Sequence, residues 1–253
     1  MNRFVLQENT RIIDLSLPLR EGLPSTWPGM KDFQHVEFKN CPSSEDPCRT
    51  CWFSMDEHCG THCDAAGHFV QPDHTNSRDS LSGEFLDLES MQGYLQVIDV
   101  RHLVGTADQG KSPIIGPDTI YSWEKENHLI EKGDIVAFLT GWDTLYFTNR
   151  DAYLENPVAK KSSSGWPAPS KETVIYLFEK GVNTLAIDAP SIGAIHDGVS
   201  VHQVGLQRRM IFIEGLTSLD KLPIAGSYFM FLPLKLADSS GCPGRAIAYI
   251  QEK

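Results

Sequence analysis

Short apolar runs, separated by polar segments rich in glycine and proline, recur along the chain and predict a sheet of many strands. The predicted strands are "RIIDLSLPL", "GYLQVIDVRHL", "DIVAFLTGW", "NTLAIDAPSI", "MIFIEGL", "SYFMFLPLKL" and "RAIAYI", and a further strand opens the segment "CWFSMDEHCGTHCD". The segments "GLPSTWPGM", "NCPSSEDPCRT" and "NPVAKKSSSGWPAPS" are predicted loops.

Helical spacing of apolar positions is confined to three segments between these strands. One helix is expected after "GPDT", with Asp118 as its cap, a second in "SKETVIYLFEKGV", capped by Ser170, and a short third in "SVHQVGLQRR". Strands and helices mix without a strict βαβ repeat, which favours an α/β or mixed α+β fold with a mixed sheet. No linker divides the pattern, so residues 1–253 are expected to form a single domain.

Composition narrows the classes of partner. The 253 residues carry a formal charge of −11 and a pI near 5.2, and an acidic surface repels phosphate backbones, which disfavours nucleic acid. No apolar run approaches the length of a membrane-spanning helix. The first residues, "MNRFVLQENTRIIDLS", lack the apolar core of a signal peptide. The sequence therefore predicts a cytoplasmic protein, with neither nucleic acid nor a membrane as its partner.

Six cysteines add one motif, the C-x-x-C pair formed by Cys48 and Cys51. A structural zinc site needs a second pair of similar spacing, and a thioredoxin-like redox site needs a following helix in a βαβ unit. Neither context is present, so free thiols are expected and the role of this pair stays open.

Candidate chemistry is concentrated in "EHCGTHCDAAGHF", where His58, His62, Asp64 and His68 fall within eleven residues. In an extended segment, even-numbered positions share one face, so all four side chains would project together and Cys59 and Cys63 would face away. A regular helix would turn Asp64 aside, and glycine and threonine disfavour one there. Imidazole and carboxylate ligands suit Zn²⁺, Mn²⁺ or Fe²⁺, so a metal site is favoured over a merely polar surface.

The same stretch resembles the signature H-x-G-T-H-x-D-x-P-x-H-F of the cyclase-like metal-dependent hydrolases, which include bacterial kynurenine formamidase and isatin hydrolase. Ala66 stands where the family usually has proline. The likeness extends in order through "RIIDLSLPL", "EKGDIVAFLTGW", "LFEKGVNTLAIDAPSI", "VHQVGLQRRMIFIEGLTSLDKLP" and "GCPGRAIAYI". It implies the family's swivelling β/β/α fold.

The resemblance also implies roles for individual residues. His58, His62 and Asp64 would hold the first ion, with zinc or manganese the expected metal. In a two-metal enzyme, Asp64 would bridge to a second ion held by His68, His202 and Glu214. In a one-metal enzyme, His68 would be free to act as a base. Catalytic roles are expected for His68 and Glu214, and Trp27 is expected to bind substrate.

The reaction that the resemblance implies is hydrolysis of a non-peptide C–N bond in a small-molecule substrate by a metal-activated water. Loops over residues 40–50 and 149–170 make the chain long for a formamidase, which favours opening of a cyclic amide, an isatin-like lactam or imide. An arylformamidase acting on N-formylkynurenine and a lactone hydrolase are the alternatives. Two further classes, a non-catalytic metal-binding scaffold and a redox protein using Cys48 and Cys51, fit the residues less well. Members of such a family are expected to form homodimers or larger homo-oligomers.

Overall fold

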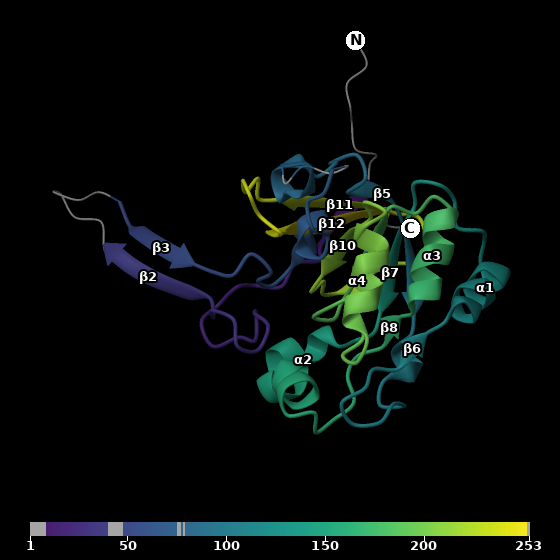
Figure 1. The fold of residues 1–253 in the computed structure, drawn as a ribbon, viewed down its shortest axis with the longest axis horizontal. Coiled ribbons are helices and arrows are strands. Elements are labelled where there is room, and N and C mark those ends of the chain that lie inside the picture. The colour runs from purple at the N-terminus through teal and green to yellow at the C-terminus, as the bar shows by residue number, and fades with distance from the viewer. Residues whose placement is uncertain (1–8, 40–47, 75–76, 78, 252–253) are drawn as a thin grey trace, which may run out of the picture.

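The computed structural model describes residues 9–39, 48–74, 77 and 79–251. Its centre is an eight-stranded sheet in the order β1-β12-β11-β5-β7-β9-β10-β4 (Figure 1). The strands are β1 (Thr10–Asp14), β4 (His62–Asp64), β5 (Gln92–Asp99), β7 (Ile135–Leu139), β9 (Thr184–Ile187), β10 (Ile211–Glu214), β11 (Ser227–Pro233) and β12 (Gly241–Gln251). Strand β4 pairs with β12 as well as with β10, so the sheet curls round and closes into a barrel.

Two hydrophobic cores follow from the alternation of side chains along these strands. Strands β5, β7, β9 and β10 are parallel, and every residue of β7 is buried. Ile135 and Ala137 point into the barrel, whereas Val136 and Phe138 point outward into the second core. Burial on both faces explains why β7 is a continuous apolar run.

Helices cover the outer face of the parallel strands (Figure 1). They are α1 (Pro117–Glu126), α3 (Lys171–Glu179) and α4 (Gly198–Leu206), while α2 (Asp143–Thr148) leads into a π-helix over Asp151–Ala159. Short 3₁₀ helices span Ala66–His68, Asp79–Leu81, Gly83–Phe85, Arg101–Leu103 and Leu219–Lys221, and β6 (Ile114–Ile115) pairs with β8 (Ala168–Pro169). None of the helices in the described ranges is long and apolar enough to cross a membrane.

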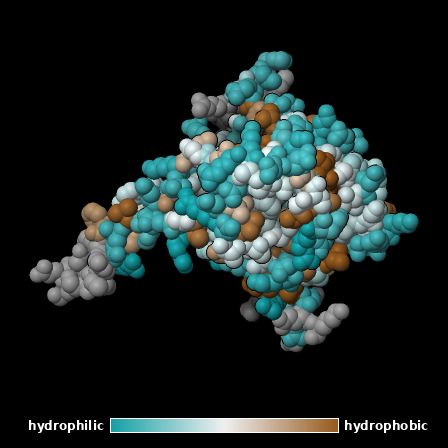
Figure 2. Space-filling model, turned by 90° about the horizontal axis from the view of Figure 1, so that it is seen from below, coloured by the Kyte–Doolittle hydropathy of each residue, from teal (hydrophilic) through white to brown (hydrophobic). Residues whose placement is uncertain are grey.

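A hairpin of β2 (Gln34–Lys39) and β3 (Thr50–Ser54) projects from the barrel as an arm (Figures 1 and 2). The two strands pair antiparallel with each other. Phe38 is 72% exposed, and Trp52 and Phe53 are also exposed. The arm therefore presents large apolar side chains to its surroundings.

The buried Asp188 carboxylate ties the ends of two parallel strands together. It follows β9 and accepts hydrogen bonds from the Thr140 amide and hydroxyl and from the Gly141 amide, which follow β7. Burial raises the pKa of Asp188 to about 7, although these hydrogen bonds act to lower it. The sequence pattern placed Asp188 within the predicted strand segment "NTLAIDAPSI" and indicated no role for it.

The predicted fold class is confirmed, and so are the predicted strands and the three helices. Ser170 caps α3 as expected, with its Oγ accepting from the Thr173 amide at 3.2 Å. The cap assigned to Asp118 is wrong, because Gly116 holds that position. Pro117 fixes the first helical residue, so Asp118 lies inside the first turn, where its charge favours the positive end of the helix.

The loop predictions are partly wrong. Part of "NPVAKKSSSGWPAPS" forms the end of the π-helix and β8, and β2 was not predicted at all. Within the predicted loop "NCPSSEDPCRT", residues 40–47 lie outside the described residues. Cys48 and Cys51 are free thiols on the arm, whereas Cys59, Cys63 and Cys242 are buried free thiols.

Candidate metal centre

The pairing of β4 with β10 brings two predicted ligands on β4 next to a third predicted ligand on β10. His62 and Asp64 lie on β4, and Glu214, the last residue of β10, pairs directly with His62. Asp64 pairs with Phe212, which belongs to the core beneath the helices. Cys63, between the two ligands, points into the barrel instead. The site therefore lies outside the barrel, on the side that α4 covers.

The chain makes a tight bend at Gly60 and Thr61, immediately before β4 begins at His62. Gly60 has a φ of +66°, and Gly215 has the same value where the chain leaves β10. A Cβ on Gly215 would lie 2.5 Å from the carbonyl oxygen of Gly60, so only glycine fits there. The Thr61 hydroxyl accepts from the Leu17 amide at 2.8 Å and donates to the Gly215 carbonyl at 2.5 Å. These contacts join Thr61, the residue that follows Gly60, to the chain segments at Leu17 and Gly215.

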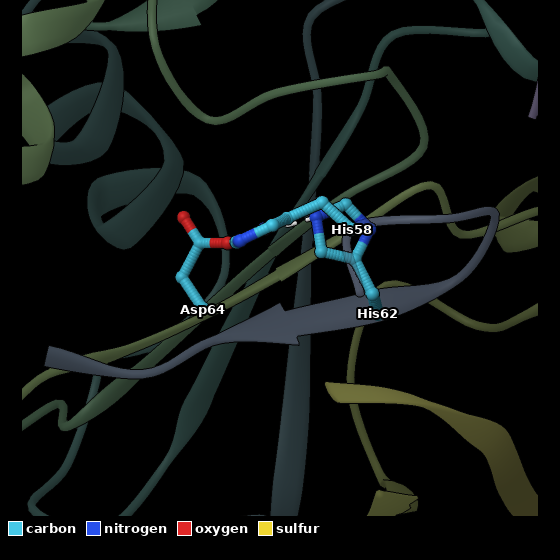
Figure 3. A group of neighbouring side chains, drawn as sticks. All are labelled: His58, His62 and Asp64. Atoms are coloured by element: carbon cyan, nitrogen blue, oxygen red, sulfur yellow. Dashed lines mark hydrogen bonds and ion pairs between the residues drawn. The ribbon is translucent and has the colours of Figure 1, made fainter. Parts of the chain in front are cut away.

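Four side chains surround the Asp64 carboxylate. Its Oδ1 lies 2.9 Å from His58 Nδ1 and 3.6 Å from His62 Nε2, and its Oδ2 lies 3.3 Å from His202 Nε2. Glu214 faces the same histidines, with Oε1 at 3.2 Å from His202 Nε2 and Oε2 at 3.5 Å from His62 Nε2. Figure 3 shows the carboxylate of Asp64 pointing at the His58 ring, with the His62 ring rising from the same strand.

Backbone carbonyls fix which nitrogen of two histidines faces this centre. His62 Nδ1 donates to the Gly60 carbonyl at 3.0 Å, and His202 Nδ1 donates to the Gly198 carbonyl at 2.7 Å. In each ring the Nε2 atom is then directed at the carboxylates. A histidine whose outer nitrogen is held in this way is oriented to offer the inner one as a metal ligand.

Electrostatics in the centre are dominated by burial and by the carboxylates. Burial acts to raise the pKa of Asp64, but hydrogen bonds with His202, His58 and His62 outweigh it and hold that pKa well below its usual range. Burial acts to lower the pKa values of His62 and His202, but Asp64 and Glu214 raise both to about 10. The two carboxylates thus favour the positively charged forms of His62 and His202 in a site that is almost closed to solvent.

Glu214 is held by the loop that follows β9. Its Oε1 accepts from the Ile192 amide at 2.7 Å and from the Ser191 hydroxyl at 3.2 Å. The Gly193 amide in turn donates to Ser191 Oγ at 3.0 Å. Ser191 and Thr61 are the supporting residues that sequence reasoning missed, although "GT" stands inside the signature itself.

Two groups of donors are arranged to hold a divalent cation. One comprises His58, His62 and Asp64, the other Asp64, His202 and Glu214, and within each group the ligand atoms lie within 4.8 Å of one another. Imidazole nitrogens with carboxylate oxygens are ligands that zinc and manganese accept. The donor set therefore fits a metal ion, and Asp64 belongs to both groups.

His68 and Trp27 lie beside this centre. The His68 ring centroid is 4.0 Å from that of His58 and 6.1 Å from that of His202. Among the residues that the structure describes, His68 belongs to neither donor group. Burial lowers its pKa. Trp27 is 39% exposed and meets Trp166 edge to face.

Both residues line a pocket of about 370 Å³ above the donor groups. The pocket also takes apolar walls from Phe69, Tyr146, Tyr153, Leu154 and Val199.

The predicted convergence of His58, His62, Asp64 and His68 is confirmed, but the extended-face explanation for it holds only for His62 and Asp64. Only residues 62–64 form a strand, His58 lies in a turn, and His68 ends a 3₁₀ helix. Chain reversal on either side of β4, rather than an extended face, brings these two rings together. His202 on α4 and Glu214 at the end of β10 lie on the elements predicted for them.

Known proteins resemble the chain over most of its length. Residues 13–194 match the model of the family described as "Putative cyclase". The chain is 30% identical to the kynurenine formamidase of Erythrobacter litoralis over 238 residues, 94% of this chain and 93% of that protein. It is 27% identical to the isatin hydrolase of Roseibium aggregatum over 208 residues, 79% of this chain and 74% of that protein.

Among solved structures, isatin hydrolase A from Labrenzia aggregata bound to benzyl benzoate superposes with a TM-score of 0.82 at 24% identity, covering 96% of this chain and 95% of that one. An isatin hydrolase bound to the product analogue thioisatinate gives 0.81 at 22% identity, covering 96% and 94%. These structures share the fold. By the family match and by its similarity to the Erythrobacter protein, the chain belongs to the putative cyclase family.

Proposed function

We propose that the protein is a metal-dependent hydrolase that opens a cyclic amide, an isatin-like lactam or imide. The observation that carries this proposal is the pairing of a cation-binding donor set with an apolar pocket directly beside it. Curated relatives named isatin hydrolase and kynurenine formamidase support hydrolysis of a non-peptide C–N bond. A lactone is attacked by the same chemistry and stays a further alternative.

The pocket suits a flat, uncharged substrate. Trp27 and Phe69 offer aromatic faces and edges on which a planar ring can pack. Among the described residues that line it, none is an arginine or a lysine, and Asp56 is the one acidic side chain outside the donor groups. A neutral cyclic amide needs no counter-ion for a carboxylate, so this lining favours it over an amino-acid substrate.

The donor groups would hold one or two ions of zinc or manganese. The two oxygens of Asp64 face different histidines, which is the arrangement of a bridging carboxylate and supports two ions. His58 and His62 would complete one position, and His202 and Glu214 the other. When bound, the cation supplies a Lewis acid for the substrate carbonyl and activates water for attack.

His68 is proposed as the proton-transferring residue. It lines the pocket beside His58, and because burial lowers its pKa, its ring is neutral near pH 7 and can accept a proton. The same ring can return that proton to the leaving nitrogen. Glu214, whose Oε1 is held by the Ile192 amide, keeps the centre anionic.

A second candidate function is that of an arylformamidase acting on N-formylkynurenine. The relative at 30% identity over nearly the whole chain carries the name kynurenine formamidase. Such a substrate bears an amino-acid group, and Arg150 lines a hollow that adjoins the pocket at Trp27 and Leu154. Arg150 would therefore supply the positive charge for the substrate carboxylate that the lining of the apolar pocket lacks.

We also propose that two copies associate. A two-stranded hairpin alone is marginally stable in water, yet the arm exposes Phe38 and Trp52. The barrel has an uncovered face too, where Ile12, Tyr249, Tyr228 and Tyr94 pair in one row across β1, β12, β11 and β5. Ile12 and Tyr94 are more than half exposed. A second copy of the chain would supply a partner for both surfaces.

The first prediction concerns the metal. Removal of bound ions with a chelator should abolish hydrolysis, and zinc or manganese should restore it. In a two-ion centre, His202→Ala and Glu214→Ala should each remove about one equivalent by elemental analysis, whereas Asp64→Asn should affect both positions. The control His102→Ala, an exposed histidine on a separate 3₁₀ helix, should keep the full metal content. Full activity in metal-free protein would refute the proposal.

The second prediction concerns His68. Because general acid–base catalysis contributes about 10²–10⁴-fold to a rate, His68→Ala should lower kcat by a factor in that range. The metal content should stay unchanged, since His68 lies outside both donor groups. Steady-state kinetics and elemental analysis of the same preparation test this, and a near-normal kcat would remove His68 from the reaction.

The third prediction concerns the substrate. With isatin, N-formylkynurenine and an aryl lactone assayed side by side, isatin should show the highest kcat/KM. Arg150→Ala should leave isatin hydrolysis unchanged, because Arg150 does not line the pocket. Preference for N-formylkynurenine, lost in Arg150→Ala, would instead establish the formamidase alternative.

The fourth prediction concerns assembly. Sedimentation should give the mass of at least two chains, and Trp52→Glu should shift the protein towards the mass of one chain by placing charge on the arm. Tyr121→Glu is a matched control, because Tyr121 on α1 is 48% exposed, the same fraction as Trp52. A single-chain mass for the unaltered protein at micromolar concentration would contradict association.

A further inference from the structure

His58 is held differently from the other two histidines of the centre. Its Nδ1 faces Asp64, while its Nε2 lies 3.1 Å from the hydroxyl of Ser240. His62 and His202 are held by backbone carbonyls and offer Nε2 instead. The orientation of His58 thus depends on a side chain that a substitution can remove.

Glu57 fixes whether the Ser240 hydroxyl donates or accepts a hydrogen bond toward His58. Its Oε1 accepts from the Ser240 amide at 3.1 Å and from the Ser240 hydroxyl at 2.5 Å. A carboxylate oxygen only accepts, so the single hydroxyl proton of Ser240 is committed to Glu57. Toward His58, Ser240 Oγ can therefore only accept a hydrogen bond. His58 Nε2 must then carry a proton and donate it to Ser240 Oγ.

The backbone at the start of β12 places Ser240 against the His58 ring. Gly241 follows Ser240 and pairs with Asp64 across the sheet. A Cβ on Gly241 would lie 2.5 Å from His58 Cε1, so the ring packs on the bare glycine backbone. The Ala65 amide donates to the Ser240 carbonyl at 2.9 Å, which ties the same segment to the end of β4.

We propose that Glu57 and Ser240 are positioning residues that hold a proton on His58 Nε2 and so direct His58 Nδ1 to the metal ion. The inference rests on the proposed function, because it presumes a cation between His58 and Asp64. Carboxylate–hydroxyl–imidazole support of this kind fixes the tautomer and the ring orientation of a ligand. Two ligands are thus set by the backbone and one by a pair of side chains.

The pair can be altered without touching the substrate pocket. Glu57 and Ser240 line a second pocket of about 490 Å³, together with Ser82, Asp238 and Ser239. Neither residue lines the apolar pocket beside the donor groups, although His58 does. A change in metal affinity caused by these substitutions therefore acts through His58.

Metal affinity tests the proposal directly. In competition with a chromogenic chelator, Ser240→Ala should bind Zn²⁺ about 10- to 100-fold more weakly than the unaltered protein, the loss typical of removing such support. Ser240→Thr, which keeps the hydroxyl, should restore the affinity, and Glu57→Gln should weaken binding while the fold is kept. Ser239→Ala is the matched control, since Ser239 Oγ donates to the Leu236 carbonyl and not to His58. Unfolding midpoints of the metal-free variants verify that each chain folds.

Nitrogen-15 NMR of histidine side chains in the zinc-loaded protein supplies a second readout. His58 should show a protonated Nε2 and a ligating Nδ1, the reverse of His62 and His202, and Ser240→Ala should lose this signature. Unchanged zinc affinity and an unchanged His58 pattern in a folded Ser240→Ala would overturn the positioning role while leaving the hydrolase proposal intact. An unaltered protein that binds neither zinc nor manganese would overturn the proposed function itself.

Discussion

The buried carboxylate of Asp64 is the constraint on which the rest of the site depends. It is 1% exposed, and an ionised carboxylate withdrawn from water costs several kcal/mol unless opposite charge and hydrogen bonds surround it. His58, His62 and His202 surround it, but Glu214 adds a second carboxylate beside the rings of His62 and His202. Two acids held this close repel each other, and a divalent cation between them would relieve that repulsion. The arrangement is suited to binding a cation rather than to stabilising the fold.

Backbone geometry makes this concentration of charge possible. The pairing of β4 with β10 places His62 and Asp64 beside Glu214, and α4 brings His202 over them. Gly60 and Gly215 allow the close approach that directs the Gly60 carbonyl at His62. The imidazoles are therefore oriented before any ion arrives, which reduces the cost of assembling the site on binding.

The signature stretch and the strand pattern carried enough information to predict the fold class and the side chains of the first donor group. His202 and Glu214 were reached through the family resemblance, since nothing local marks either as a ligand. The extended-face argument failed for His58 and His68, because turns rather than strand periodicity position them. Thr61 stands inside the signature, but its role and the roles of Glu57, Ser191 and Ser240 were not predicted, since they arise from contacts between residues far apart in the chain. The role of Asp188 was not predicted for the same reason, because its hydrogen-bond partners Thr140 and Gly141 are distant in the sequence.

The most direct test is anomalous diffraction from crystals of the zinc-loaded protein, recorded on both sides of the zinc absorption edge. The account predicts an anomalous peak between Asp64 and the rings of His58 and His62, and a two-ion centre adds a second peak between Asp64, His202 and Glu214. A structure in which zinc binds elsewhere, with these side chains paired only with one another, would contradict it.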